Sequence, residues 1–305
     1  MTARQLRWLA SSELLLYVVL SAWLVVQRGW QPAETAGLAL SAFLGLRLFV
    51  VALTFAFMLG ASDPVPDDMR IGPARALRMA LEEYVALILL FTVIQPFESF
   101  WLGPDRLNER ADARPPLLLI HGYQCNRGFW FWLRSRLEGA GWTVATHNLE
   151  PLWADIDSYA AGIARRIDEV LAACGAQQVI LVCHSMGGPV ARAYLRRHGA
   201  DKVARIVTLG SPHQGTRLAV LGLGQNARQL RIGNPWLTAL AAPGAAPLPA
   251  GSASIFSVHD NYVFPQQAGA LLPGARNLAI GGVSHLGMAF SPVVLDKLLE
   301  VLGST

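Results

Sequence analysis

The residues with the clearest chemical potential surround Ser185, in the segment VILVCHSMGGP over residues 179–189. The apolar, β-branched first half of this segment predicts a buried strand, and its second half predicts the start of a helix. A serine at the tight turn between a strand and a helix forms a nucleophile elbow, in which the hydroxyl is exposed. Such a turn needs small neighbours, which Gly187 and Gly188 provide, whereas Cys183 stands where the motif G-x-S-x-G has glycine. We therefore predict that Ser185 is a catalytic nucleophile at the positive end of a helix.

A loop that follows an earlier apolar run is the expected partner of this serine. The run over residues 117–120 leads into His121-Gly-Tyr-Gln. A loop in this position supplies one backbone N–H to the oxyanion of a tetrahedral intermediate, and the residue after the nucleophile supplies another. The backbone N–H groups of Tyr123 and Met186 are the predicted donors. Each donor of this kind changes the rate by roughly 10²–10³-fold.

The acid and the base that a catalytic serine needs come later in the chain. Asp260 and His285 each follow an apolar run, and the order serine, acid, histidine is typical of this arrangement. His285 would take the serine proton, and Asp260 would hold the tautomer of the imidazole. His213 lies before the acid and breaks this order. His184 is expected to point away from the serine, because neighbours on a strand alternate in direction.

Short apolar runs alternate with helical patterns from residue 117 onward, and this alternation predicts how these groups come together. Strands that alternate with helices indicate a parallel sheet with helices on both faces. The expected fold class is therefore α/β, a mostly parallel sheet flanked by helices. The predicted strands cover residues 117–120, 143–145, 179–183, 206–209, 255–258 and 278–280, and the predicted helices cover 129–138, 159–174, 189–198 and 293–302.

Five motifs in this half of the chain resemble those of a known family. LLLIHGYQCN, VILVCHSMGG and VTLGSPHQGT, with the looser matches SVHDNYVFP and GGVSHLG, are similar to segments of bacterial triacylglycerol lipases and related esterases of the α/β-hydrolase fold. The resemblance covers residues 116–305, and VTLGSPHQGT is its most lipase-specific motif. It implies a serine hydrolase that cleaves carboxylic esters of fatty acids through an acyl-enzyme. It also implies Ser185, Asp260 and His285 as the catalytic triad.

The segment after His285 indicates whether the chain binds a metal, and the triad itself is compatible with more than one reaction. Some lipases of this kind bind a structural calcium through aspartates flanking the histidine loop. After His285 this chain continues Leu-Gly-Met-Ala-Phe, without a nearby carboxylate, so we expect no calcium, no other metal and no cofactor. An acyltransferase or a thioesterase would use the same triad and stays an alternative. A non-catalytic membrane protein that keeps the fold is disfavoured, because every expected triad member is present in order.

The first hundred residues are a different kind of sequence. The whole chain is 53% hydrophobic and only 15% charged, against roughly 25% charged in an average soluble domain. This composition excludes intrinsic disorder. The net charge of +4 is small and scattered, which argues against nucleic-acid binding. The excess apolar residues lie in the uncharged runs 14–26 and 84–97 and in the run 36–61, which Arg47 interrupts.

These runs predict membrane helices. A spanning helix needs about 20 apolar residues, and only the run 36–61 reaches that length cleanly. We favour three spans in a hydrophobic helical region over residues 1–103, followed by a linker over 104–116 and a catalytic domain over 117–305. A buried helical cap is the alternative. A signal peptide is a rival interpretation of the first run, but no convincing cleavage site follows it.

The arginine distribution predicts the side of the membrane on which the catalytic domain lies. Arg4 and Arg7 precede the first run, and Arg70, Arg75 and Arg78 lie between the second and third runs. Arginine is enriched in cytoplasmic loops, and these two segments fall on the same side if all three runs span. The catalytic domain is then on the non-cytoplasmic side, in a protein of the bacterial inner membrane. The loss of one span reverses this prediction.

A cluster of aromatic residues follows the predicted oxyanion loop. Phe129, Trp130 and Trp132 belong to it, and they are candidates for substrate binding, as a wall for an acyl chain or as a contact with the membrane interface. Packing in the core is the alternative interpretation. Residues 218–242 repeat apolar side chains and are a candidate lid. The expected partners are therefore a lipid or ester substrate and the bilayer.

Overall fold

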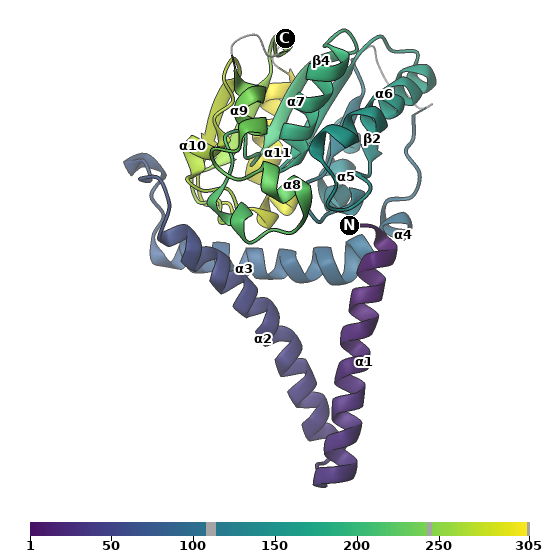
Figure 1. The fold of residues 1–305 in the computed structure, drawn as a ribbon, viewed down its shortest axis with the longest axis vertical. Coiled ribbons are helices and arrows are strands. Elements are labelled where there is room, and N and C mark those ends of the chain that lie inside the picture. Colours follow the sequence, from purple (N-terminus) through teal and green to yellow (C-terminus); the bar gives the residue numbers. More distant parts are fainter. Residues whose placement is uncertain (108–113, 243–245, 304–305) are drawn as a thin grey trace.

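The protein consists of a rounded domain above two long helices in a computed structural model (Figure 1), which describes residues 1–107, 114–242 and 246–303. Helix α1 (Ala3–Arg28) and helix α2 (Pro32–Leu59) form a V, whose tip lies away from the domain and whose open ends reach it. Gly29 ends α1 in the left-handed conformation, with φ at 68°. Glycine adopts this conformation without a steric penalty, so the chain can reverse at once into α2.

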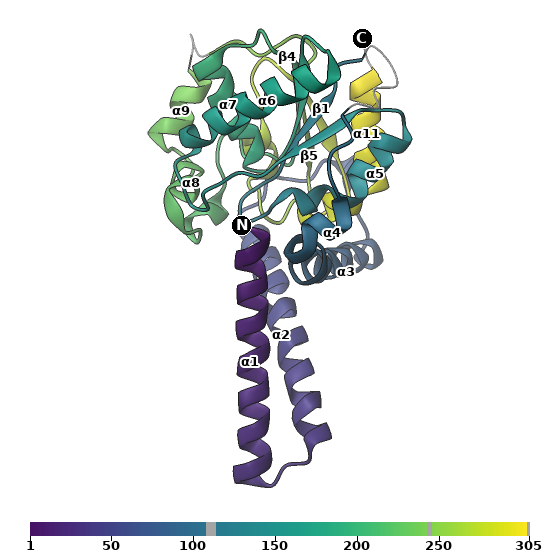
Figure 2. The same cartoon turned by 90° about the vertical axis from the view of Figure 1, so that its right-hand side faces the viewer.

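A third long helix lies across the base of the domain instead of running beside the other two. Helix α3 (Pro73–Ile88) crosses the open ends of the V in Figure 1 and is seen nearly end-on in Figure 2. It continues through a wide π-helical turn (Leu89–Ile94) and a tight turn (Gln95–Phe97) into the short helix α4 (Glu98–Leu102). Pro96 lacks a backbone donor, so a regular helix is interrupted at this point.

Six parallel strands form the sheet of the domain, in the order β2-β1-β3-β4-β5-β6. Every residue of β1, β3 and β5 is buried, as expected for a parallel sheet that is covered on both faces. The predicted strand 117–120 is confirmed, and the other five predictions differ from the observed strands by up to three residues at an end. The strands are β1 (Leu117–Ile120), β2 (Val144–His147), β3 (Val179–His184), β4 (Val203–Leu209), β5 (Ala253–Ser257) and β6 (Arg276–Ile280).

Helices cover both faces of the sheet, which confirms the predicted α/β fold class. Helices α5 (Phe131–Gly139) and α11 (Pro292–Gly303) pack on one face. Helices α6 (Ala160–Cys174) and α7 (Gly187–His198) pack on the other. Leu90, from the turn that follows α3, is fully buried in the first of these two apolar clusters. The N-terminal helices and the domain therefore share one hydrophobic core.

The segment predicted as a lid folds into short helical pieces. They comprise a tight turn (Arg217–Val220), helix α8 (Gly224–Gln229) and helix α9 (Pro235–Ala241). Figure 1 shows α8 at the edge of the domain that faces the N-terminal helices. A further short helix, α10 (Gln266–Ala270), follows β5.

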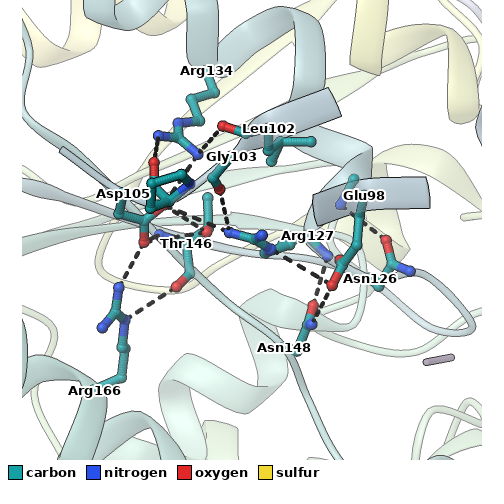
Figure 3. A network of polar contacts seen from close by, with 12 residues as sticks. Glu98, Leu102, Gly103, Asp105, Asn126, Arg127, Arg134, Thr146, Asn148 and Arg166 are labelled. Atoms are coloured by element: carbon teal, nitrogen blue, oxygen red, sulfur yellow. Dashed lines mark hydrogen bonds and ion pairs between the residues drawn. The ribbon is translucent and has the colours of Figure 1, made fainter. Parts of the chain in front are cut away.

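The predicted linker is fastened to the domain near its first residue (Figure 3). The carboxylate of Asp105 accepts hydrogen bonds from Arg166 (2.6 Å) and from the backbone N–H of Thr146 (2.8 Å), and it pairs with Arg134 at 3.1 Å. Only 5% of the Asp105 side chain is exposed. Residues 108–113 of the predicted linker lie outside the described residues. At Asp105 the junction is a buried ion-pair cluster and not a solvated tether.

The N-terminal helices are long and apolar enough to cross a membrane. Three segments, Ala3–Arg28, Pro32–Leu59 and Pro73–Leu102, meet this description. Large apolar side chains on α1 and α2 stay exposed, including Leu15 at 63% and Phe49 at 62%. Extended apolar surfaces of this kind mark contact with a membrane or another protein. The helices thus suggest membrane association, in agreement with the sequence analysis.

Candidate active site

Ser185 lies at the sharp turn between β3 and α7. Its backbone φ is +53°, a strained conformation for a residue with a side chain and one that is common at functional sites. Gly187 makes the turn possible, because a Cβ there would lie 2.6 Å from the carbonyl oxygen of Ile120 on the neighbouring strand. Ser185 is half-buried and lines a cavity. The structure around the serine is thus the strand–turn–helix arrangement that the sequence predicts.

The loop after β1 lies directly against this serine. A Cβ on Gly122 would come within 2.7 Å of the Cβ of Ser185, so only glycine fits at the contact. His121 stabilises the loop, because its Nδ1–H donates to the carbonyl of Gly122 (2.9 Å) and its Nε2 accepts the backbone N–H of Leu149 (3.0 Å). Burial lowers the pKa of His121 to about 3. The imidazole is therefore neutral at ordinary pH, as these two hydrogen bonds require.

The two predicted oxyanion donors flank the contact between the loop and the serine. Tyr123 follows Gly122 in the loop, and Met186 follows Ser185 at the N-terminus of α7. The hydroxyl of Tyr123 donates to the carbonyl of Leu223 (2.8 Å) and accepts the backbone N–H of the same residue (2.9 Å). The loop is thereby joined to the predicted lid segment. The role of the two backbone N–H groups stays a prediction.

Asp260 and His285 meet beyond the ends of two neighbouring strands, β5 and β6. The Nδ1–H of His285 donates to Oδ2 of Asp260 (2.8 Å), and both side chains are almost fully buried. The other carboxylate oxygen, Oδ1, accepts the backbone N–H groups of Tyr262 and Val263 (2.8 Å each). The carboxylate is therefore fixed in place, and Nε2 of His285 remains as the proton acceptor of the ring.

The plane of the imidazole is also fixed. The ring of Tyr262 is stacked on that of His285, with 4.9 Å between ring centroids and an angle of 18° between their planes. Ser185 and His285 line the same cavity, and Asp260 is hydrogen-bonded to His285. The structure thus brings together the three residues that the sequence analysis singled out.

The cavity beside Ser185 is mainly apolar and encloses about 470 Å³. Apolar walls with a few polar groups are typical of sites for small ligands. The walls come from the surroundings of the serine, from the predicted lid segment and from the N-terminal helices. The lid segment contributes Leu218, Ala219, Leu221, Leu223 and Leu230, and the N-terminal helices contribute Val50, Thr54, Leu87 and Phe91. The contribution of the N-terminal helices was not predicted.

The aromatic cluster is placed differently from the predicted substrate wall. Phe129 and Trp130 are fully buried in the core of the domain, and Phe129 is stacked on His184 with 4.0 Å between ring centroids. Trp132 is half-buried, and the guanidinium of Arg136 lies 5.3 Å from the centre of its ring. None of the three belongs to the described residues that line the cavity. The alternative interpretation, core packing, fits Phe129 and Trp130, because a helix start beneath a sheet buries its aromatic side chains.

The direction of His184 also differs from the prediction. Its ring lines the cavity, 4.6 Å from that of His285 between centroids. Side chains alternate in direction only within a strand, and β3 ends at His184. Ser185 has a positive φ and belongs to the turn, so the two side chains can face the same cavity. Burial lowers the pKa of His184 well below its ordinary value. His213 is fully buried, with Nε2 3.0 Å from the hydroxyl of Thr208, which is the environment of a packed core residue.

Three polar residues that the sequence analysis did not single out lie beside the acid and the base. They are Glu83 of α3, Thr54 of α2 and Asn261, and all three are buried. Asn261 accepts the backbone N–H of His285 and donates to Glu83 and Thr54. In the sequence Glu83 precedes an apolar run and resembles a charge that flanks a membrane helix. The signal that could have found it is its spacing, which places Glu83 on the same face of the helix as the apolar residues Met79 and Ala86.

The possible metal ligands and the thiols of the chain are considered next to the proposed triad. Across the part of the chain that the structure describes, no group of three or more His, Cys, Asp or Glu side chains is placed to hold a metal ion. Cys125 and Cys183 are buried free thiols. Burial raises the pKa of Cys125 to about 12, so this thiol beside the cavity stays protonated and is a poor nucleophile.

Comparison with known families agrees with this geometry. Residues 115–258 match the family model described as alpha/beta hydrolase fold. They include the first strands of the sheet and the elbow with Ser185. The chain has the alpha/beta hydrolase fold. We therefore call the part of the chain from β1 onward the hydrolase domain.

Two curated relatives match part of the chain. A triacylglycerol lipase of Pseudarthrobacter phenanthrenivorans is 32% identical over 117 residues, which is 36% of this chain and 36% of that protein. A triacylglycerol lipase of Burkholderia plantarii is also 32% identical over 117 residues, which is 36% of this chain and 32% of that protein. The chain thus spans about a third of the length of the curated relatives it matches.

Solved structures share the fold of the hydrolase domain. Mature lipase BlEst2 of Bacillus licheniformis is 21% identical with a TM-score of 0.55, covering 66% of this chain and 94% of that one. Lipase B of Aspergillus fumigatus is 19% identical with a TM-score of 0.54, covering 61% of this chain and 52% of that one. At these identities the likeness concerns the fold alone.

Proposed function

We propose that this protein is a membrane-associated serine hydrolase that cleaves carboxylic esters of lipids. Ser185 is the nucleophile, His285 the general base and Asp260 the acid that orients the base. The observation that carries the proposal is the 2.8 Å hydrogen bond between His285 and Asp260 at the cavity that also contains Ser185 on its elbow. The matching triacylglycerol lipases support the same reaction class.

The proposed mechanism has two half-reactions. Nε2 of His285 takes the hydroxyl proton of Ser185 while Oγ attacks the ester carbonyl carbon, and the backbone N–H groups of Tyr123 and Met186 bind the oxyanion. The imidazolium then gives the proton to the leaving oxygen as the ester C–O bond breaks, which releases an alcohol and leaves an acyl-enzyme. Water, deprotonated by His285, cleaves the acyl-enzyme into a fatty acid and free serine. Asp260 stabilises the imidazolium in both steps.

The cavities support a lipid as the substrate. A second cavity, of about 490 Å³, lies between α1 and α2. Phe91 and Gln124 line both this cavity and the one that contains Ser185, so the two adjoin each other. Apolar side chains of α1 and α2, which include Leu9 and Phe43, face the second cavity. An acyl chain of a membrane lipid can therefore approach the serine from between the two helices.

The contacts of the N-terminal helices support two membrane spans in place of three. The Nη1 group of Arg7 in α1 donates to the carbonyl of Pro96 (2.7 Å), and the neighbouring Gln95 accepts the backbone N–H of Asn126 in the hydrolase domain (2.7 Å). Thr54 in α2 accepts a hydrogen bond from Asn261 of the same domain (2.8 Å). The start of α1 and the end of α2 thus both lie against the same domain. We infer that α1 and α2 cross the bilayer as a hairpin and that both ends of the hairpin return to one side.

The two faces of α3 support a position in the plane of the membrane surface. One face is buried against the domain through Met79 and Ala86, and the other exposes Leu77, Leu81 and Val85 at 64%, 53% and 50%. Helices with an apolar face of this kind lie at the interface between lipid and water. The segment Pro73–Leu102 is long and apolar enough to span, but in this proposal α3 lies along the membrane surface. The catalytic domain is then on the opposite side from the one expected for three spans.

The hydrolase domain then lies on the side of Arg4 and Arg7, which is the cytoplasmic side by the arginine rule. Fusions to residue 305 test this arrangement. A fluorescent protein that matures only in the cytoplasm is expected to fluoresce there, and a phosphatase that is active only outside the cytoplasm is expected to be inactive. The opposite pair of results would restore three spans and the non-cytoplasmic placement.

The activity is tested with full-length protein in detergent and p-nitrophenyl esters with acyl chains from C2 to C16. We expect an optimum at long chains, and we expect Ser185→Ala to lower kcat by about 10⁴-fold or more and to abolish labelling by a fluorophosphonate. Ser158→Ala, an exposed serine, is the matched control. A short-chain optimum would contradict the lipid substrate, and absence of labelling in the wild type would contradict the proposed nucleophile.

A further inference from the structure

Glu83 is a buried carboxylate that the proposed mechanism does not use. It lies on α3, in the N-terminal region, and only 1% of it is exposed. Oε2 accepts the backbone N–H groups of Leu286 (2.9 Å) and Gly287 (3.0 Å), and Oε1 accepts the side-chain N–H of Asn261 (3.2 Å). All three partners are donors, which is the environment that suits an ionised carboxylate. A charge is not buried in this way without a specific set of partners.

The two backbone donors belong to the residues directly after His285. They begin a short helical turn (Leu286–Phe290) whose N-terminal cap is His285 itself. A carboxylate at the first N–H groups of a helical turn makes charge-assisted hydrogen bonds, which are about twice as strong as neutral ones. Glu83 therefore fixes the backbone on the C-terminal side of His285.

Asn261 fixes the backbone on the other side. Its Oδ1 accepts the backbone N–H of His285 (3.0 Å), and its Nδ2 donates to Thr54 (2.8 Å) as well as to Glu83. Asn261 directly follows Asp260 in the chain, so this residue connects the acid and the base with helices α2 and α3. Burial raises the pKa of Glu83, and the opposite effect comes from the nearby imidazole of His285 and from the hydrogen bonds that the carboxylate accepts, including those of Gly287 and Asn261.

We propose that Glu83 is a positioning residue for the catalytic histidine, acting through Asn261 and the backbone that follows His285, and that the N-terminal helices thereby complete the active site. The proposal rests on the proposed function. The negative charge holds the histidine loop in place, and it stabilises the imidazolium that forms when His285 takes the serine proton. Removal of the charge therefore affects both the rate and the pH at which the histidine loses its proton.

The chain offers a closely matched set of variants. Glu83→Gln keeps the size of the side chain and removes its charge, but its amide N–H₂ then faces the N–H₂ of Asn261. The double variant Glu83→Gln with Asn261→Asp exchanges the carboxylate and the amide. The amide at position 83 can then donate to the carboxylate at position 261, and the pair keeps one negative charge. Glu82→Gln is the control, because Glu82 is the neighbouring carboxylate and is partly exposed beside Arg78.

The variants are compared as full-length proteins in detergent, with a soluble short-chain p-nitrophenyl ester. We expect Glu83→Gln to lower kcat by about 100-fold with little change in KM, as a misplaced catalytic group does. The acid limb of the kcat/KM profile is expected to move down by about one pH unit, because a nearby negative charge no longer favours the imidazolium. We expect kcat of the double variant to be at least about tenfold higher than that of Glu83→Gln. We expect kcat of Glu82→Gln to match that of the wild type.

The rate of fluorophosphonate labelling of Ser185 gives a second readout that does not depend on the ester. Wild-type kcat and an unmoved acid limb in Glu83→Gln would overturn the proposal. A lower kcat with an unmoved limb and no recovery in the double variant would also overturn it, since Glu83 would then only hold the fold together. Wild-type protein that neither hydrolyses esters nor reacts with the fluorophosphonate would instead contradict the proposed function.

Discussion

The two halves of the proposed active site are built in different ways. Ser185 is held by the sheet itself, because Gly187 allows a close approach to the backbone of the neighbouring strand and Gly122 allows the loop after β1 to contact Ser185. The backbone around His285 is held by side chains, and some of these belong to helices more than 170 residues earlier in the chain. The elbow is thus placed by the fold of the hydrolase domain, although Gln95 of the N-terminal region also accepts the backbone N–H of Asn126 in the loop after β1 (2.7 Å). In the acid–base half the N-terminal region bonds directly to the residues that follow His285.

This difference indicates where the N-terminal region acts. It supplies walls to the cavity and hydrogen bonds to the histidine loop, and the described contacts of Gly122 and Gly187 with the elbow involve the hydrolase domain alone. Disturbing the N-terminal helices should therefore weaken proton transfer more than it weakens the elbow. Two substitutions test this separation, beyond those described for Ser185 and Glu83.

Asp260→Asn is expected to have the larger effect. It keeps the shape of the side chain but removes the charge that holds the tautomer of His285, so kcat should fall by about 10³- to 10⁴-fold. Labelling of Ser185 by the fluorophosphonate should become slow without disappearing, because the elbow is left intact. Asp157→Asn is the control, since that carboxylate is 40% exposed. A variant that keeps more than a tenth of the wild-type kcat would show that another group orients the base.

Thr54→Val is expected to have the smaller effect. Valine has the same shape in the cavity wall but cannot accept the hydrogen bond from Asn261, so kcat should fall by about 2- to 10-fold. Thr54→Ser should keep most of the activity. Thr35→Val, at a second buried threonine of α2, is the matched control. If Thr54→Val matches the wild type in kcat, then α2 forms a wall of the site without positioning the acid–base half.

Much of the fold and of the site could be predicted because its signals are local. The strand at 117–120 is a short apolar run followed by a turn, and the elbow at Ser185 is defined by the small residues around it. The order of Asp260 and His285 after their strands also follows from the sequence. Their meeting at 2.8 Å depends on strand order, which no local pattern shows.

The remaining features depend on contacts between distant segments. Phe129 and Trp130 carry the same signal whether they face a substrate or the core, and only the packing beneath the sheet places them in the core. In the sequence Glu83 resembles a charge at the edge of a membrane helix. Its role depends on the position of α3, which lies across the base of the hydrolase domain (Figure 1). An apolar run of sufficient length likewise predicts a membrane span. Whether the helix crosses the bilayer also depends on how the helix is oriented relative to the hydrolase domain, which the sequence does not show.

The segment from α3 to α4 is fastened to the hydrolase domain near both of its ends, and this has a kinetic consequence. Arg75 near its start donates to the carbonyl of Gly282 (2.7 Å), and the Asp105 cluster holds the chain just after α4. In the proposed arrangement the catalytic serine therefore stays at a constant height above the lipid surface. Such an enzyme meets its substrate in two dimensions, and the quantity that governs its rate is the number of ester molecules per unit area. Dilution of the substrate with inert lipid slows turnover even when the amount of ester in the sample stays the same.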